Sequence, residues 1–203
     1  MKSKETGIKR QIVLSIYDAY QAIFVIKAIM FSENPKHRLF SHLYSSEYQT
    51  IIVNIGKLFD KSKSATSLLG LIKTHRSVIK NEEYEFASKS ASDIEKKYKT
   101  LLDKIEGLRN NLGAHHNREE LNSMYDNISA EKVPEATEMQ SLLSEIMDLI
   151  ENLSFIDEGD LSLLQDRIGA KDVMDLLGLK IDPVVSRKIF RDMWGISDEA
   201  DLG

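Results

Sequence analysis

The sequence contains no cysteine, and it has only 3 prolines and 10 glycines among its 203 residues. The absence of cysteine excludes disulfide bonds, a thiolate nucleophile and any zinc site with cysteine ligands. The prolines and glycines fall mostly between segments in which apolar residues recur every three or four positions. Their scarcity within those segments favours a mostly helical protein. Hydrophobic residues make up 42% and charged residues 29%, a balance typical of a globular domain with a sizeable core.

Several motifs of well-known functional sites are also missing. The chain has no Glu-x-x-His, the signature of di-iron helical bundles. It has neither of the common glycine-rich nucleotide-binding loops, nor a nucleophile elbow. We therefore expect no metal and no cofactor. The net charge of −5 means that a nucleic acid would need a local basic groove.

Nothing in the sequence predicts a membrane-spanning segment. The longest apolar stretch, residues 22–31, is interrupted by Lys27 and is too short to cross a bilayer. The first residues lead into an amphipathic pattern rather than the apolar core of a signal peptide. We expect a cytoplasmic protein with no membrane partner.

Apolar periodicity predicts five helices in the first three quarters of the chain. They cover residues 8–30, 37–59, 67–75, 81–112 and 134–153, with Pro134 in the first turn of the last one. The fourth is expected to be one long helix, because its apolar stripe runs from Ile94 to Leu112 without interruption. Residues 158–203 carry only short helical patterns. The prediction is an all-α, up-and-down helical bundle over residues 1–157, followed by a short helical C-terminal extension.

Residues 108–117 concentrate more chemistry than any other stretch. Arg109, Asn110, His115 and His116 combine a cation, an amide and two groups that titrate near neutral pH. On an unbroken helix, Arg109 and His116 share a face, whereas His115 continues the apolar seam that begins at Leu108. These residue types also fit a plain structural role, in which the histidines complement the helix dipole and Arg109 lies on a solvated face.

The spacing of Arg109-Asn110, four further residues and then His115 resembles the R-x(4–6)-H motif of the HEPN superfamily. Leu58-Phe59-Asp60, followed by Ser67-Leu68-Leu69, is similar to the subgroup around the AbiU2 abortive-infection proteins. This resemblance covers roughly residues 8–153 and leaves the C-terminal segment outside.

The resemblance implies a metal-independent endoribonuclease of a bacterial defence or toxin–antitoxin system. In this interpretation Arg109 holds the scissile phosphate of an RNA substrate, Asn110 orients the site, and His115 acts as general acid or base. His116 could replace or assist His115. The products would carry a 2′,3′-cyclic phosphate. The resemblance further implies a homodimer with a composite cleft, and a possible antitoxin or defence-system partner.

Two other interpretations remain open from the sequence. One is a non-catalytic HEPN-like module that dimerises or recruits a partner, and the other is a helical adaptor unrelated to HEPN proteins. Basic residues that could attract RNA exist locally, although lysines on a helix commonly form a solvated face. They are Lys96, Lys97, Lys99, Lys104 and Arg118.

Overall fold

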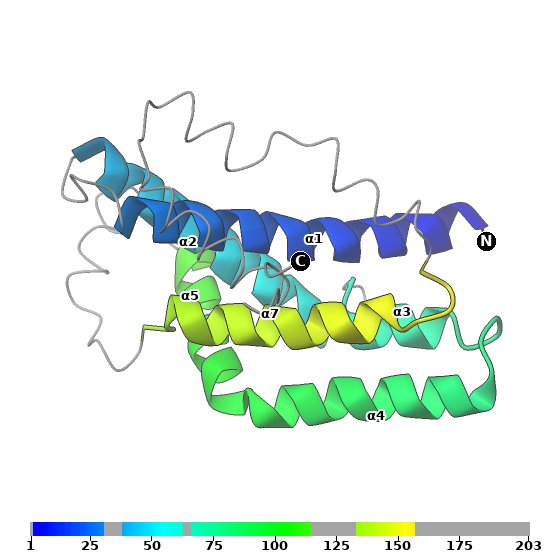
Figure 1. Ribbon diagram of the computed structural model, residues 1–203. Coiled ribbons are helices and arrows are strands. Elements are labelled where there is room, and N and C mark those ends of the chain that lie inside the picture. The colour runs from blue at the N-terminus through cyan, green and yellow to red at the C-terminus, as the bar shows by residue number, and fades with distance from the viewer. Residues whose placement is uncertain (1, 31–37, 63–65, 115–132, 157–203) are drawn as a thin grey trace, which may run out of the picture.

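The computed structural model describes residues 2–30, 38–62, 66–114 and 133–156 of the chain, and these form six helices with no strand. The helices are α1 (Lys2–Met30), α2 (Arg38–Leu58), α3 (Leu68–Thr74), α4 (Asn81–Lys97), α5 (Lys99–Ala114) and α7 (Ala136–Glu151) (Figure 1). The predicted all-α bundle is therefore confirmed. The predicted extension, residues 158–203, lies outside the described residues.

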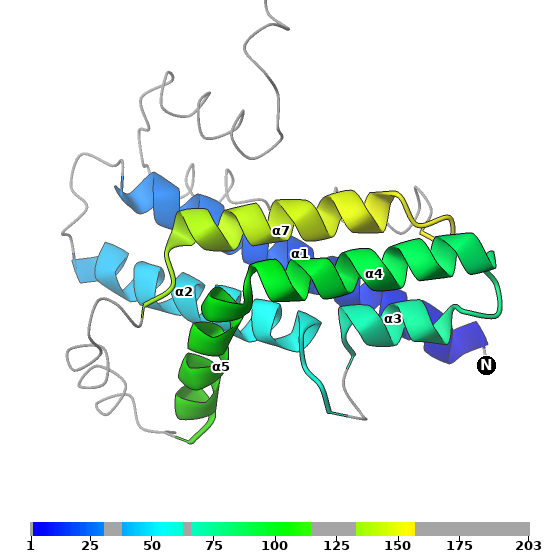
Figure 2. The ribbon, with the colours of Figure 1, turned by 90° about the horizontal axis from the view of Figure 1, so that it is seen from below.

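The core takes buried apolar residues from all six of these helices. The helix α1 packs along α2 and also contacts α3 and α7, while α4 contacts α3 and α7 on the other side (Figures 1 and 2). Isoleucines dominate the centre, and Ile23, Ile52 and Ile146 have no measurable exposure. The predicted core face of α7 is confirmed, because Met139, Leu142, Leu143, Ile146, Leu149 and Ile150 are buried. Apolar burial of this extent is the main stabilising term of such a bundle.

The apolar part of α1 is longer than the sequence stretch identified above. Residues Gly7–Met30 are long and apolar enough to cross a membrane by length and composition alone. Most of this segment is buried against the other helices, with Ile12, Ile16 and Ile26 at most 1% exposed. A helix with such a wide apolar surface fits the packing of α1 against three other helices, α2, α3 and α7.

Two helix starts show how local chemistry sets the boundaries. The side chain of Ser67 caps α3 by accepting a hydrogen bond from the backbone N–H of Gly70 at 3.3 Å. The predicted start of α7, Pro134, is two residues too early, because Glu135 is the N-cap and the helix begins at Ala136. The Pro134 carbonyl instead accepts a buried hydrogen bond from the Tyr48 hydroxyl at 2.9 Å, which ties α2 to the start of α7.

The prediction of one helix over residues 81–112 is wrong. The chain breaks at Tyr98, whose backbone (φ −99°, ψ 18°) leaves the helical region, and α5 turns away from α4 (Figure 2). The helix α4 lies against α3 and α7, whereas α5 lies against α2. Tyr98 anchors the break, since its hydroxyl donates a hydrogen bond to Glu145 of α7 at 2.7 Å. The break brings Arg109 next to the end of α2.

Candidate functional site

Arg109 lies on α5 and reaches across to the C-terminal end of α2. Its Nη1 donates a hydrogen bond to the carbonyl of Gly56 at 3.1 Å, and its Nη2 donates to Oδ2 of Asp60 at 2.8 Å. The Arg109 side chain remains 35% exposed. A guanidinium has five N–H donors in a fixed fork, so these two contacts fix its orientation and leave further donors available.

Gly56 makes this close approach possible. A Cβ atom at position 56 would lie 2.7 Å from Cδ of Arg109, closer than carbon atoms pack in proteins. Any other residue at position 56 would therefore push the Arg109 side chain away from the surface of α2. The glycine is in the last turn of α2, where it weakens the helix slightly.

Asp60 follows α2 and is held by its own loop. Its Oδ1 accepts a hydrogen bond from the backbone N–H of Ser62 at 2.9 Å, the geometry of an Asx turn. The Ser62 backbone N–H and then the Arg109 guanidinium lower the pKa of Asp60 to about 2. Asp60 is consequently ionised throughout the neutral pH range, and its charge fixes Arg109 under all physiological conditions.

The exposed edge of Arg109 faces a groove between the end of α2 and the helices α4 and α5. The groove has a volume of about 760 Å³. Among the described residues its walls carry equal numbers of opposite charges: Lys61, Lys96, Lys99 and Arg109 against Asp60, Glu95, Asp103 and Glu106. Lys61 pairs with Glu95 at 2.7 Å, and Lys99 pairs with Asp103 at 2.6 Å. The groove is therefore not a broad basic surface, and Arg109 is its most strongly oriented cation.

Only some of the lysines that were expected to attract RNA line this groove. Lys96 and Lys99 line the groove, and so does Lys61, which was not among the basic residues predicted from the sequence. Lys97 instead pairs with Glu145 of α7. Lys104 is not among the residues that line the groove, and Arg118 lies outside the described residues.

The predicted site residues are placed only in part. Asn110 is exposed and lines the groove beside Arg109. His115 and His116 lie outside the described residues, immediately after α5, whose helical backbone continues through Ala114. The expectation that the histidines share the site with Arg109 therefore stays a prediction.

Sequence reasoning assigned no role to Gly56, and it used Asp60 only for a family resemblance. Two signals pointed to them. A glycine within an otherwise apolar helical pattern often marks a close approach of another group. An Asp at a helix end, two residues before a serine, favours a local turn. Neither signal identifies Arg109 as the partner.

Comparison with curated proteins gave no match, and comparison with solved structures gave none either. The model of the family described as AbiU2 (HEPN_AbiU2) matches residues 16–170, which is more than half of the chain. This match includes every residue of the Arg109 groove and excludes the interpretation as a helical adaptor unrelated to HEPN proteins. The chain belongs to the AbiU2 family of HEPN proteins.

Proposed function

We propose that this protein is a metal-independent endoribonuclease whose active site is built around Arg109. The observation that carries the proposal is the orientation of the guanidinium. The Gly56 carbonyl and the Asp60 carboxylate hold it at 3.1 and 2.8 Å, while the side chain stays 35% exposed and lines an open groove. A cation fixed before the substrate arrives stabilises the charge that develops on a phosphate in the transition state.

The chemistry requires two further groups that transfer protons. His115 removes the proton of an RNA 2′-hydroxyl, and the 2′-oxygen attacks the adjacent phosphorus. The bond from phosphorus to the 5′-oxygen breaks, and that oxygen takes a proton from the acid, for which His116 is a candidate. The products are a 2′,3′-cyclic phosphate and a free 5′-hydroxyl. Arg109 binds the non-bridging oxygens throughout, and Asn110 orients the phosphate.

The charge balance of the groove determines how RNA is held. Because acidic and basic side chains are equal in number, long-range attraction contributes little, and affinity depends on direct phosphate contacts. A second copy of the chain would supply additional contacts. The proposal therefore includes a homodimer with a composite cleft, in the cytoplasm, acting in defence or as a toxin restrained by an antitoxin.

The alternative function is a non-catalytic HEPN module that dimerises or recruits a partner. One observation favours it: the Arg109–Asp60 pair already joins α5 to α2 as a complete ion pair, so it could serve stability alone. The two functions differ in what Arg109 variants do. A structural pair affects the free energy of unfolding, whereas a catalytic arginine affects cleavage in a protein that stays folded.

The test is cleavage of labelled single-stranded RNA and tRNA in EDTA. Wild type is compared with Arg109→Ala, Arg109→Lys, His115→Ala and His116→Ala, each checked for folding by circular dichroism. Arg76→Ala is the matched control, since Arg76 is an exposed arginine that stacks on Tyr84 outside the groove.

We expect wild type and Arg76→Ala to cleave equally and to produce cyclic-phosphate ends. Loss of the oriented donors in Arg109→Ala should reduce cleavage about 100-fold or more. A folded, dimeric wild type that cleaves none of these RNAs would refute the nuclease proposal and favour the binding module.

A further inference from the structure

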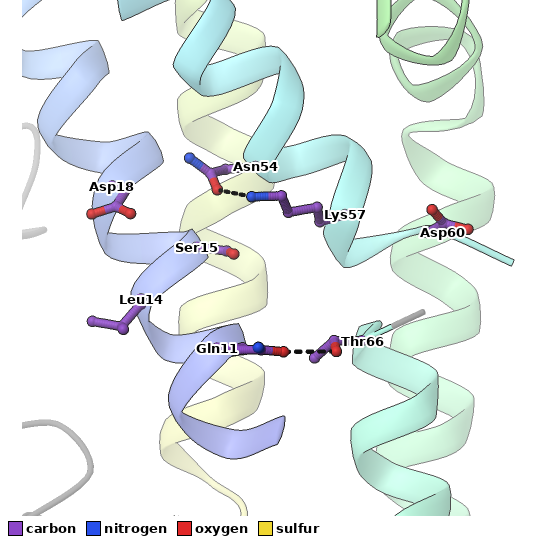
Figure 3. A pocket seen from close by; sticks show the side chains of 8 residues that line it. All are labelled: Gln11, Leu14, Ser15, Asp18, Asn54, Lys57, Asp60 and Thr66. Carbon is purple, nitrogen blue, oxygen red and sulfur yellow. Dashed lines mark hydrogen bonds between the residues drawn. The ribbon is translucent and has the colours of Figure 1, made fainter. Parts of the chain in front are cut away.

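A second pocket lies between α1 and α2 (Figure 3). Its volume is about 400 Å³, and it is lined by residues of both helices and by Thr66. Asp60 lines both this pocket and the Arg109 groove. No role for this pocket follows from the Arg109 chemistry described above.

Two buried polar side chains open into this pocket with hydrogen-bonding capacity to spare. Asn54 is 7% exposed and Ser15 is 9% exposed. The Oδ1 atom of Asn54 accepts a hydrogen bond from Lys57 at 3.4 Å, but its amide N–H groups have no partner among the described residues. The Ser15 hydroxyl has none there either. In the same described part, every side-chain nitrogen or oxygen that is sealed from solvent has a partner, so both groups face the pocket.

The charges around these groups select the kind of ligand. Lys57 contributes one ammonium, and Asp18 and Asp60 contribute two carboxylates, of which the Asp60 carboxylate is already paired with Arg109. The carboxylates disfavour a simple anion, and the ammonium disfavours a simple cation. A neutral group with both donors and acceptors fits best. Leu14 also lines the pocket and adds apolar surface to it.

A nucleobase has these properties. It is neutral and flat, and its edge carries donors and acceptors that an asparagine amide can pair with in a bidentate manner. Proteins that read single-stranded RNA form hydrogen bonds with the edges of unstacked bases. The pocket is also next to the groove, because Asp60, which accepts a hydrogen bond from Arg109, lines it.

We infer that the pocket between α1 and α2 binds the base of a nucleotide next to the scissile phosphate and sets the sequence preference of cleavage. Asn54 is the specificity-determining residue, and Ser15 and Lys57 assist it. This inference rests on the proposed ribonuclease function, since it assumes that the Arg109 groove holds the phosphate.

The experiment maps cleavage sites in a random-sequence RNA for wild type, Asn54→Ala and Ser15→Ala. Asn152→Ala is the matched control, because Asn152 is exposed at the end of α7 and lines neither cavity. We expect wild type and Asn152→Ala to share a preference for one base beside the cut. Asn54→Ala should reduce that preference about tenfold, which corresponds to the loss of one base contact. Ser15→Ala should weaken it less, and it keeps the fold because the hydroxyl has no partner among the described residues.

A wild-type enzyme without preference beside the cut would overturn the inference and leave the ribonuclease proposal intact. The same holds if Asn54→Ala and Ser15→Ala both keep the wild-type preference. If wild type cleaves no RNA, the ribonuclease proposal fails, and the pocket is then tested by titrating the four neutral nucleosides and following chemical shifts. Binding of one nucleoside that is weakened in Asn54→Ala supports a base pocket, and the absence of binding by all four refutes it.

Discussion

Replacing Gly56 by alanine tests the contact on which the candidate site depends. Alanine is favoured over glycine within a helix by about 0.5–1 kcal/mol. The new Cβ would lie 2.7 Å from Cδ of Arg109, whereas carbon atoms pack best at about 3.5–4.0 Å. Arg109 must therefore retreat by roughly 1 Å, which weakens its hydrogen bonds to the position-56 carbonyl and to Asp60.

The structure allows the net effect to be estimated. A hydrogen bond to a charged group contributes about 1.5–3 kcal/mol when well formed. The Arg109 and Asp60 side chains are 35% and 22% exposed, so solvent screening reduces this value. We expect Gly56→Ala to lower the free energy of unfolding by about 1 kcal/mol in the wild type. In an Arg109→Ala background it should raise that free energy by about 0.5–1 kcal/mol, because only the helix effect remains.

The assay is a double-mutant cycle measured by urea unfolding and followed by circular dichroism. Gly107→Ala is the control, because Gly107 also lies within a helix, α5, but a Cβ there would meet nothing within 4 Å. It should stabilise both backgrounds by the same amount. If Gly56→Ala also changed stability equally in both backgrounds, Arg109 would not lie across Gly56, and an active site built on that contact would be refuted.

Three further predictions concern contacts elsewhere in the bundle and the charge of the site. Tyr48→Phe leaves the buried Pro134 carbonyl without its donor and should lower the free energy of unfolding by about 1–3 kcal/mol; urea unfolding measures it, and no change would show that the bond is not formed in solution. Tyr98→Phe removes the hydrogen bond to Glu145, whose side chain is 33% exposed, and should lower the free energy of unfolding by about 1 kcal/mol; urea unfolding measures it, and no change would show that this bond does not stabilise the fold. Asp60, with its pKa lowered to about 2, should contribute fully to stability above about pH 4 and lose that contribution between about pH 4 and 2. The free energies of unfolding of wild type and Asp60→Asn should then differ by the same amount at pH 5 and at pH 8. A difference that changes between pH 5 and 8 would contradict the lowered pKa.

The positions of the helices could be predicted well from the sequence because local rules determine them. The helices α2 and α3 begin and end within one residue of the predicted boundaries, since apolar periodicity and the Ser67 cap are local signals. The break at Tyr98 could not be predicted, because the apolar stripe passes through it and neither glycine nor proline marks it. Its cause is a change of packing partner from α7 to α2, which no local pattern contains.

From the sequence, only the part of the candidate site that lies on α5 could be predicted. Arg109 and Asn110 stood out because they interrupt an apolar pattern with a cation and an amide. The partners of Arg109 did not stand out, since Asp60 and Gly56 are 49 and 53 residues away along the chain. Their contact with Arg109 depends on α5 turning towards α2. This turn is a consequence of the helix break at Tyr98, which the local sequence pattern does not indicate.

Asp60 lines both cavities. It is therefore possible to test whether the two cavities bind the same RNA strand. One of its oxygens receives the Arg109 hydrogen bond in the groove, and its side chain also lines the pocket that contains Asn54. If both cavities hold one RNA strand, substitutions on either side act on a shared substrate and should not be additive, because groups that share a partner couple by about 0.5–3 kcal/mol. Arg109→Lys should mainly lower the cleavage rate, Asn54→Ala should mainly change the base preference, and Asp60→Asn should change both. A cleavage rate and a base preference that Asn54→Ala leaves unchanged would instead indicate that the groove and the pocket bind different ligands.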